Sequence, residues 1–399
     1  MKKSLIAIAA MVATGAFAQS SLTISGQLDA GIVNAKDAAG NSRTAQAAGQ
    51  FGASRLRFTG TEDLGSGLKA SFNLEMQPSM ANGGTSANGL FNRGAWLQLG
   101  SAGVGDLRIG RQGTVAMGLI CGVDQHGCYS GFDGGGILFN GAGATSRWIS
   151  GNVGRGQNGN VGISTFTSGP GAGAVGTSSG DVTRVTNAFT YISPNFSGFT
   201  GQLQYALGGA ATPNVNSGNG NAMGLSLNYA NGPIMVGLAY QATNADRAPT
   251  AAVLANPLAV TPAVAAFAGT SKGNQTTIGA TYDFSVVKVG AIFQSESASS
   301  VNGSAPLWTK ANGWALTAVA PMGAFAPYVK LGSHKTNGIG AYGIVNGADA
   351  SIINLGTTYN LSKRTKVYAD FVRDAKGNRG VAGFNTAPSQ LGLGLQHTF

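Results

Sequence analysis

Basic side chains gather in the first third of this chain, and their spacing gives them a common direction. Arg55 and Arg57 alternate with Leu56, Phe58 and Gly60. On an extended strand, both guanidinium groups therefore project from the face opposite to the apolar residues. Clustered cations attract anions and speed their arrival, and salt screens this attraction. The chemistry that this pattern favours is an electrostatic field on one face of a strand.

Residues for bond-making chemistry are sparse. The three histidines (His126, His334 and His397) lie far apart in the sequence, and there are only two cysteines. Gly-rich stretches occur, but none has the spacing of a phosphate-binding loop. We therefore expect no enzyme, no metal site and no cofactor.

The composition narrows the class of protein. Of the 399 residues, 10% are charged, 43% are hydrophobic and 64 are glycine, and the formal net charge is +10. Soluble domains carry about 25% charged residues, and disordered chains are less hydrophobic. There is no apolar run of about 18 residues, which excludes a helical membrane bundle. The Lys and Arg residues are dispersed, so the positive charge does not indicate nucleic-acid binding.

The first residues have the features of a secretory signal peptide. Met1-Lys2-Lys3 is followed by the apolar stretch Leu5–Ala13 and then by Ala16-Phe17-Ala18. A basic start, a short apolar region and an A-x-A site are typical of such a peptide. We expect residues 1–18 to be cleaved, leaving 19–399 as the exported protein.

Segments of about ten residues with alternating apolar positions follow Gln19 and predict strands with two unlike faces. No segment shows helical spacing. Clear examples are Leu22–Ala30, Leu68–Met76, Ile278–Phe284 and Leu391–Phe399.

Short and long connections alternate between these segments, which is typical of an up-and-down barrel. Counting the segments gives about sixteen strands in one domain. Short turns are predicted at 63–67, 100–103, 193–198, 231–233, 284–286, 321–323 and 361–364. Long loops are predicted near 35–50, 78–89, 113–183, 208–221, 245–272, 297–311, 336–348 and 375–388.

The polar face of the strands indicates whether the barrel lies in water or in a membrane. A barrel of sixteen strands is too wide for side chains to fill, so its interior is aqueous. The apolar face must then point outward into lipid, where a closed sheet leaves no backbone group unpaired. The sequence predicts an all-β transmembrane antiparallel barrel.

The basic residues can then be assigned to the lumen or to the rim. Arg55, Arg57 and Lys69 follow the lumen phase, and so does Arg108 if its neighbours face lipid. Arg93 and Arg111 fall on the lipid phase by strict alternation. An arginine at mid-membrane costs about 2–4 kcal/mol, so a bulge or a rim position is expected for both.

The long region 113–183 carries further candidate residues. Arg147 adds positive charge there, and Asp124 and Asp133 are candidates for an opposing acidic wall. Cys121 and Cys128 are close in sequence, and an exported protein meets an oxidising compartment, so a disulfide is expected. A pair of free thiols is the alternative.

Several motifs, in order, resemble the general trimeric porins of Gram-negative bacteria, in their β-proteobacterial and neisserial branch. The resemblance covers nearly all of 19–399. It rests on Gln19-Ser-Ser-Leu-Thr-Ile-Ser-Gly, Ser54-Arg-Leu-Arg-Phe-Thr-Gly-Thr-Glu-Asp-Leu-Gly, Phe91-Asn-Arg, Gly110-Arg-Gln, Ser193-Pro-Asn-Phe, Tyr359-Asn-Leu-Ser-Lys-Arg-Thr and Phe399.

This resemblance implies a homotrimer in the outer membrane, surrounded by lipids and lipopolysaccharide, with a third loop (113–183) folded into the lumen. It favours Arg93 and Arg111 as pore-lining residues. It also implies that the barrel-assembly machinery recognises the terminal Phe399.

The leading hypothesis is a passive diffusion channel for small anionic and neutral solutes that prefers anions. An alternative is a channel selective for phosphate, sulfate or an organic acid. Two other classes, an outer-membrane adhesin and an outer-membrane enzyme, receive less support, because the histidines are too scattered for catalysis.

Overall fold

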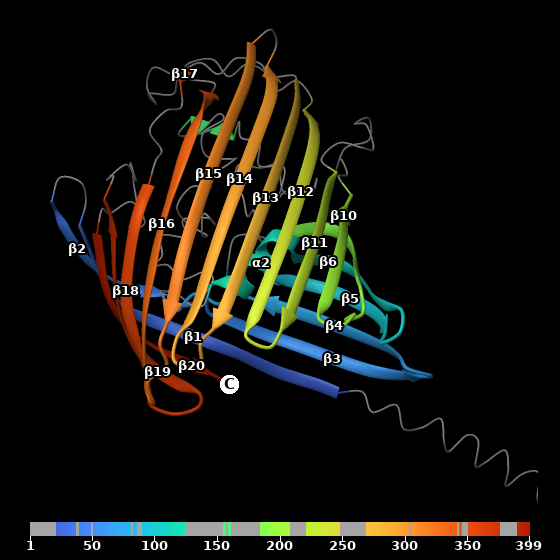
Figure 1. Ribbon diagram of the computed structural model, residues 1–399, viewed down its shortest axis with the longest axis horizontal. Coiled ribbons are helices and arrows are strands. Elements are labelled where there is room, and N and C mark those ends of the chain that lie inside the picture. The colour runs from blue at the N-terminus through green and yellow to red at the C-terminus, as the bar shows by residue number, and fades with distance from the viewer. Residues whose placement is uncertain are drawn as a thin grey trace, which may run out of the picture.

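The computed structural model is dominated by long, slanted β-strands (Figure 1). It describes residues 21–36, 40–48, 51–80, 83–85, 90–124, 155–156, 159–160, 184–207, 221–247, 269–302, 305–340, 343–344, 350–375 and 389–399. The strands of the first half are β1 (Ser21–Lys36), β2 (Ser42–Ala48), β3 (Arg55–Gly65), β4 (Leu68–Met76), β5 (Gly94–Ser101), β6 (Gly105–Gly113), β7 (Arg155–Gly156), β8 (Gly159–Asn160), β9 (Arg184–Ile192) and β10 (Phe199–Ala206). Those of the second half are β11 (Ala222–Asn231), β12 (Ile234–Arg247), β13 (Gly269–Asp283), β14 (Lys288–Asn302), β15 (Ala305–Val319), β16 (Phe325–Gly340), β17 (Gly343–Ile344), β18 (Ala350–Asn360), β19 (Thr365–Asp374) and β20 (Ser389–Thr398).

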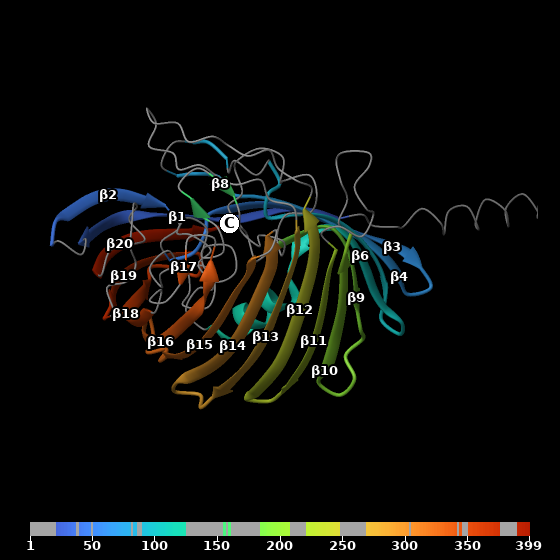
Figure 2. The ribbon, with the colours of Figure 1, turned by 90° about the horizontal axis from the view of Figure 1, so that it is seen from above.

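Eighteen strands form one antiparallel sheet. Two of them are short: β2 pairs with the end of β1, and β17 pairs with the end of β16, both on the side of the long loops. The other sixteen pair in chain order, and β1 closes the sheet by pairing with both β3 and β20. Seen from above, the strands surround a central space that contains a helix, α2 (Figure 2). The prediction of a sixteen-stranded up-and-down barrel is confirmed.

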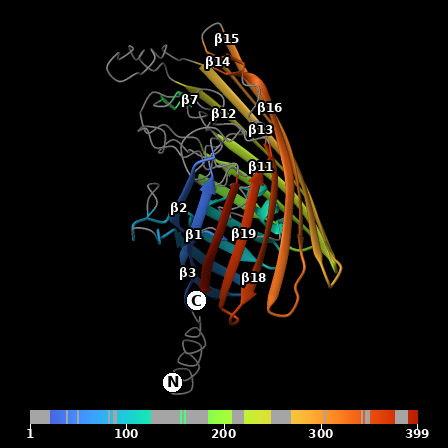
Figure 3. The same ribbon diagram turned by 90° about the vertical axis from the view of Figure 1, so that its left-hand side faces the viewer.

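The last residue completes the seam. The Gly26 amide donates to the Phe399 carbonyl oxygen at 2.9 Å, and the Phe399 amide donates to the Gly26 carbonyl oxygen at 3.1 Å. The C-terminus lies at the short-turn end of the barrel, beside β1 (Figure 3). A Cβ on Gly26 would lie 2.8 Å from the Phe399 ring, so only glycine leaves room for the aromatic terminus.

All seven predicted short turns are present, whereas some predicted long loops are strand. The region 297–311 is largely a hairpin, because β14 and β15 stay paired as far as Asn302 and Ala305. β1 and β2 likewise pair across much of 35–50. Small polar residues there resemble loop composition, yet the ladder continues because its backbone hydrogen bonds do not depend on side chains.

The two faces of the barrel differ as predicted. On β20, the leucines 391, 393 and 395 are 53%, 60% and 47% exposed, while Gln390 and Gln396 are 3% and 4% exposed. Aromatic pairs flank this apolar surface at the short-turn end, with ring centroids 4.6 Å apart for Phe199–Tyr229 and for Phe325–Tyr359. Such girdles mark the edge of the hydrocarbon layer.

The expectation of no helical segment was wrong in one place. Helix α2 (Val115–Val123) begins after Thr114, whose hydroxyl accepts a hydrogen bond from the Met117 amide at 3.2 Å. No helix in the described part of the chain is long and apolar enough to cross a bilayer. The helix packs on the inner face of β11–β14 through one buried face, whereas Gly118 and Gly122 on its other face are exposed but apolar. An all-round apolar segment has no clear period, which hid it in the sequence.

Candidate functional site

The centre of the site is a carboxylate on the inner face of β4. Glu75 pairs with Arg57 of β3 across the sheet, and directly opposite residues of an antiparallel pair share a face. Arg57 Nη2 lies 2.8 Å from Glu75 Oε2, and Arg57 Nε donates to the same oxygen at 3.0 Å. The pair therefore lies on the lumen wall, as the alternation of β3 predicts.

Arg93 approaches the same carboxylate from the other side. It directly precedes β5, and its Nε lies 2.7 Å from Glu75 Oε1 while its Nη1 donates to Gln77 Oε1 at 2.9 Å. Only 4% of the side chain is exposed. Strict alternation places this residue toward lipid, but it lies beyond the end of the strand, where the chain turns inward.

Arg111 and Arg184 frame the long third loop region. A register shift between Gly110 and Gln112 interrupts the pairing of β6 with β9, and Gly110 has a φ of +127°. Arg111 lies within this bulge, and its Nε donates to the Asn92 carbonyl oxygen at 2.6 Å. Arg184, the first residue of β9, donates from Nε to the Arg93 carbonyl oxygen at 2.7 Å.

Arg55 is held by backbone rather than by a carboxylate. Its Nε donates to the Ala53 carbonyl oxygen at 3.3 Å, and Gln27 donates to the same oxygen at 2.9 Å. Residues 51–54 lie on the inner face because the buried Asp29 accepts a hydrogen bond from the Gly52 amide at 3.0 Å. Among the described residues, no ion pair neutralises Arg55.

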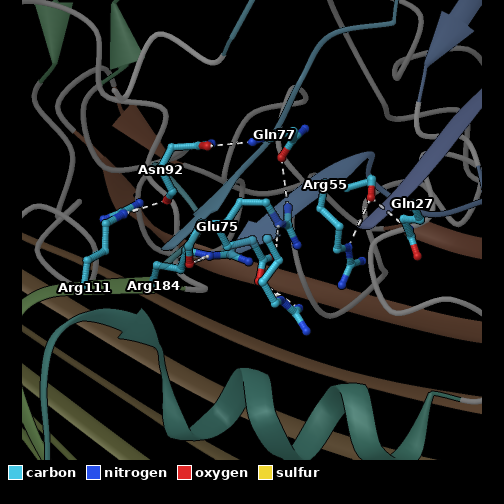
Figure 4. A network of polar contacts seen from close by, with 10 residues as sticks. Gln27, Arg55, Glu75, Gln77, Asn92, Arg111 and Arg184 are labelled. Atoms are coloured by element: carbon cyan, nitrogen blue, oxygen red, sulfur yellow. Dashed lines mark hydrogen bonds and ion pairs between the residues drawn. The ribbon is translucent and has the colours of Figure 1, made fainter. Parts of the chain in front are cut away.

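Five arginines lie near one another on this wall, and we call them the arginine cluster: Arg55, Arg57, Arg93, Arg111 and Arg184. Figure 4 shows Arg55, Arg111 and Arg184 around Glu75. Glu75 is the one carboxylate paired with these arginines among the residues that the structure describes. Arg184 was missed from the sequence. The signal available was its place at the first alternating residue after the long loop.

Two other predicted residues lie on the inner face but outside the cluster. Arg108 donates to Gln98 Oε1 at 2.9 Å, and its guanidinium lies 4.2 Å from the centre of the Trp96 ring. Lys69 is exposed near the short-turn end of β4, six residues before Glu75 and thus about 20 Å away along the strand.

Asp124 lies across the barrel, at the end of α2, where it is paired. Its Oδ2 lies 2.6 Å from Lys330 Nζ, and both side chains are buried. The pair compensates the carboxylate, so Asp124 adds little free negative charge opposite the arginine cluster. Cys121 of α2 is disulfide-bonded. Arg147, Asp133 and Cys128 lie outside the described residues.

The helix and the arginine cluster occupy different parts of the barrel wall. The cluster belongs to β3–β6 and β9, whereas α2 contacts β11–β14, and β10 lies between the two groups of strands. A charged part of the wall is therefore followed by a part that is covered by a helix. This arrangement fits a water-filled passage in which the helix limits the width and the arginine cluster sets the electrostatic field.

Comparisons with known proteins agree with this geometry. Residues 4–379 match the family model described as Gram-negative porin. Outer membrane porin protein 32 of Delftia acidovorans is 30% identical over 421 aligned residues, covering 100% of both chains. An outer membrane porin protein of Bordetella pertussis is 27% identical, also over the full length of both chains. The solved structure of an anion-selective porin from Comamonas acidovorans superposes with a TM-score of 0.66 at 25% identity, covering 96% of this chain and 100% of that one. The chain therefore belongs to the Gram-negative porin family, as a β-barrel channel protein of the outer membrane.

Proposed function

We propose that this porin is a passive channel for small hydrophilic solutes that favours anions, and that the arginine cluster sets this preference. The observation that carries the proposal is that five arginines lie on one stretch of inner wall, with Glu75 as the one carboxylate paired with them among the described residues. Cations lining a narrow passage attract anions and repel cations without any chemical step. The likeness to an anion-selective porin supports the same conclusion.

Arg55 is the residue with the greatest expected influence. Arg57 and Arg93 share the charge of Glu75, whereas Arg55 has no carboxylate partner among the described residues. In water, an ion about 4 Å from a unit charge gains about 1 kcal/mol. Replacing Arg55 with glutamate changes the local charge by two units, or about 2 kcal/mol for an ion at that distance, which corresponds to a change of up to about thirtyfold in the local concentration of that ion.

The test is the reversal potential of purified protein in planar bilayers under a salt gradient. Wild-type protein is expected to pass anions preferentially, and Arg55→Glu to lose most of that preference. Lys69→Glu is the matched control, since it makes the same charge change on the same inner face about 20 Å away. Equal effects of the two variants would refute a localised site and leave only an effect of net charge.

The same recording separates a general channel from a selective one. A channel selective for phosphate, sulfate or an organic acid shows current that its own solute blocks at low concentration. We propose a general channel, because the arginines of the cluster come from several strands (β3, β6 and β9) and from the residue before β5, which suits small anions of different shapes. Block by one of these anions, but not by chloride, would contradict this.

The assembly proposals rest on the family. We propose a homotrimer whose outer surface contacts lipids and lipopolysaccharide. We also propose that the barrel-assembly machinery recognises Phe399 and that residues 1–18 are removed. We propose further that the third loop spans 113–183, with Arg147 and Asp133 at the constriction, and that Cys121 and Cys128 form a disulfide. Cross-linking of membranes tests the trimer, and the intact mass of unreduced protein tests both the cleavage and the disulfide.

A further inference from the structure

The pairing partner of β1 changes along its length, and the change leaves a short piece of chain outside the ladder. Ala48, the last residue of β2, pairs with Ala30, and Arg55, the first residue of β3, pairs with Gln27. More chain separates Ala48 from Arg55 than separates Ala30 from Gln27, so the surplus leaves the sheet, as in a large β-bulge. We call its described part, residues 51–54, the inner segment.

Asp29 of β1 holds the inner segment against the wall. It is 0% exposed and lies at the interruption of the ladder, between the two pairs. Its Oδ2 accepts a hydrogen bond from the Gly52 amide at 3.0 Å. The Asp29 amide donates to the Ser54 hydroxyl at 3.0 Å, so a side chain replaces the backbone partner that β1 lacks at this point.

Side chains of the neighbouring strands hold the Asp29 carboxylate in turn. The Tyr368 hydroxyl of β19 donates to Oδ1 at 2.8 Å, and the Gln396 amide of β20 donates to Oδ2 at 3.2 Å. Tyr368 reaches across β20 because Gly394 leaves room, since a Cβ there would overlap the tyrosine oxygen. Both carboxylate oxygens therefore have donors, which offset the cost of burying the charge.

Packing adds to these hydrogen bonds. The Phe51 ring stacks on Tyr368 with ring centroids 5.4 Å apart, and Lys366 Nζ lies 4.6 Å from the centre of the Phe51 ring. A Cβ on Gly52 would lie 2.8 Å from Gln27 Nε2, so glycine allows the close approach. The inner segment is thus fitted to the wall that β1, β19 and β20 form.

The inner segment also holds Arg55. The Ala53 carbonyl oxygen accepts hydrogen bonds from Arg55 Nε at 3.3 Å and from Gln27 Nε2 at 2.9 Å (Figure 4). No ion pair among the described residues involves Arg55, so this backbone oxygen is what orients its guanidinium group. Because Asp29 fixes Gly52, the residue before Ala53, a chain of contacts runs from Asp29 to Arg55.

We propose that Asp29 is a positioning residue for anion selection, which acts through the inner segment to keep Arg55 at the passage. The inference rests on the proposed function, because it concerns the same preference for anions. It also predicts the opposite sign to that expected from charge. Removing the Asp29 carboxylate makes the lumen more positive, which by charge alone raises the preference for anions. If Asp29 acts by positioning Arg55, its removal lowers that preference.

The experiment compares Asp29→Ala with Asp29→Asn by reversal potentials in planar bilayers under a salt gradient. Both variants remove the same charge, but asparagine keeps the size of the side chain and one acceptor oxygen for the Gly52 amide, whereas alanine keeps neither. The anion-to-cation permeability ratio is expected to stay at or above the wild-type value in Asp29→Asn and to fall below it in Asp29→Ala. If Arg55 moves from about 4 Å to about 8 Å from a passing anion, its attraction in water halves, which lowers the local concentration of the anion about twofold.

A neutral variant keeps the test decisive if Asp29→Ala does not fold. Phe51→Ala removes the stacking on Tyr368 without changing any charge and lies outside the strands, so the barrel is expected to form and the permeability ratio to fall. A wild-type ratio in Phe51→Ala would then overturn the inference.

The other outcomes separate this inference from the proposed function. A ratio in Asp29→Ala at or above the wild-type value shows that Asp29 acts through its charge alone, which overturns the inference and leaves the anion-preferring channel intact. A wild-type channel without any anion preference overturns the proposed function, and the inference with it.

Discussion

Two parts of the barrel wall are built from the same antiparallel ladder but differ in their inward-facing residues: the arginine wall (β3–β6 and β9) and the helix wall (β11–β14). On β3 and β4, the inner face carries the long side chains of Arg57 and Glu75. On β11–β14, the residues beneath α2 are glycines, which in chain order are Gly224, Gly237, Gly279 and Gly290. One wall projects charge into the passage, and the other removes side chains so that a helix can lie against it.

The fit of the helix wall is close. A Cβ on Gly237 would overlap Leu119 Cδ1, and a Cβ on Gly279 would lie 2.7 Å from Val123 Cγ2. Each turn of α2 therefore lies over an inner-face glycine. The two walls therefore have different functions. Packing of α2 on one wall fixes the width of the passage, and the arginines of the other wall set the electrostatic field.

The largest effect on the helix wall is expected from the Lys330–Asp124 ion pair. Lys330→Met removes the cation of this buried ion pair, and removing one member of a buried pair costs about 3–5 kcal/mol. The end of the helix then loses its ionic contact with β16. Urea unfolding in lipid vesicles measures the loss of stability, and single-channel recording is expected to show larger, noisier current.

The double variant Lys330→Met/Asp124→Leu sharpens this result. Replacing both charges with apolar groups leaves no uncompensated charge, so much of the lost stability is expected to return. If Lys330→Met alone costs less than about 1 kcal/mol, a value typical of exposed pairs, the pair is not what secures the helix.

Filling the glycine seat is expected to have the next largest effect. Gly237→Val places atoms where Leu119 Cδ1 now lies, and overpacking costs about 1–3 kcal/mol. The barrel is expected to fold with α2 displaced, which changes conductance. Gly232→Ala, in a turn of the same hairpin where no atom lies near the added carbon, is the control for glycine loss, although its positive φ of 55° adds a small strain.

The barrel could be predicted from the sequence because its signal is repeated. The alternation of apolar positions recurs from strand to strand, as in Leu391, Leu393 and Leu395. A mistake in predicting one strand therefore does not change the prediction for the others. The extended hairpin of β14 and β15 could not be predicted, because residues such as Ser299 and Ser300 look like loop in composition while their backbone remains paired.

The site was harder to predict because it depends on exceptions to that alternation. Arg57 follows the pattern and lies on the inner face. Arg93 lies past a strand end and Arg111 lies in a bulge, so counting positions fails for both. The Lys330–Asp124 contact joins residues 206 positions apart, and no local pattern contains that information.

Within the arginine wall, Arg57 and Arg93 bind the same carboxylate but differ in exposure. The side chain of Arg57 is 38% exposed, whereas that of Arg93 is 4% exposed. Arg93→Gln is therefore expected to cost clearly more stability than Arg57→Gln, which should cost at most about 1 kcal/mol, as for exposed pairs. Urea unfolding of the two variants measures the difference, and equal costs would contradict the distinct roles.

The smallest expected effect is the response of the anion preference to pH. Guanidinium groups stay protonated throughout the physiological range, so a preference set by the arginine cluster should be constant between about pH 6 and pH 8. Histidine is the side chain that changes charge in that range. Reversal potentials recorded over this pH range therefore show whether arginines or a histidine set the preference. A constant anion-to-cation permeability ratio agrees with the arginine cluster. A ratio that falls steadily as pH rises assigns the preference to a histidine and breaks the division of tasks between the two walls.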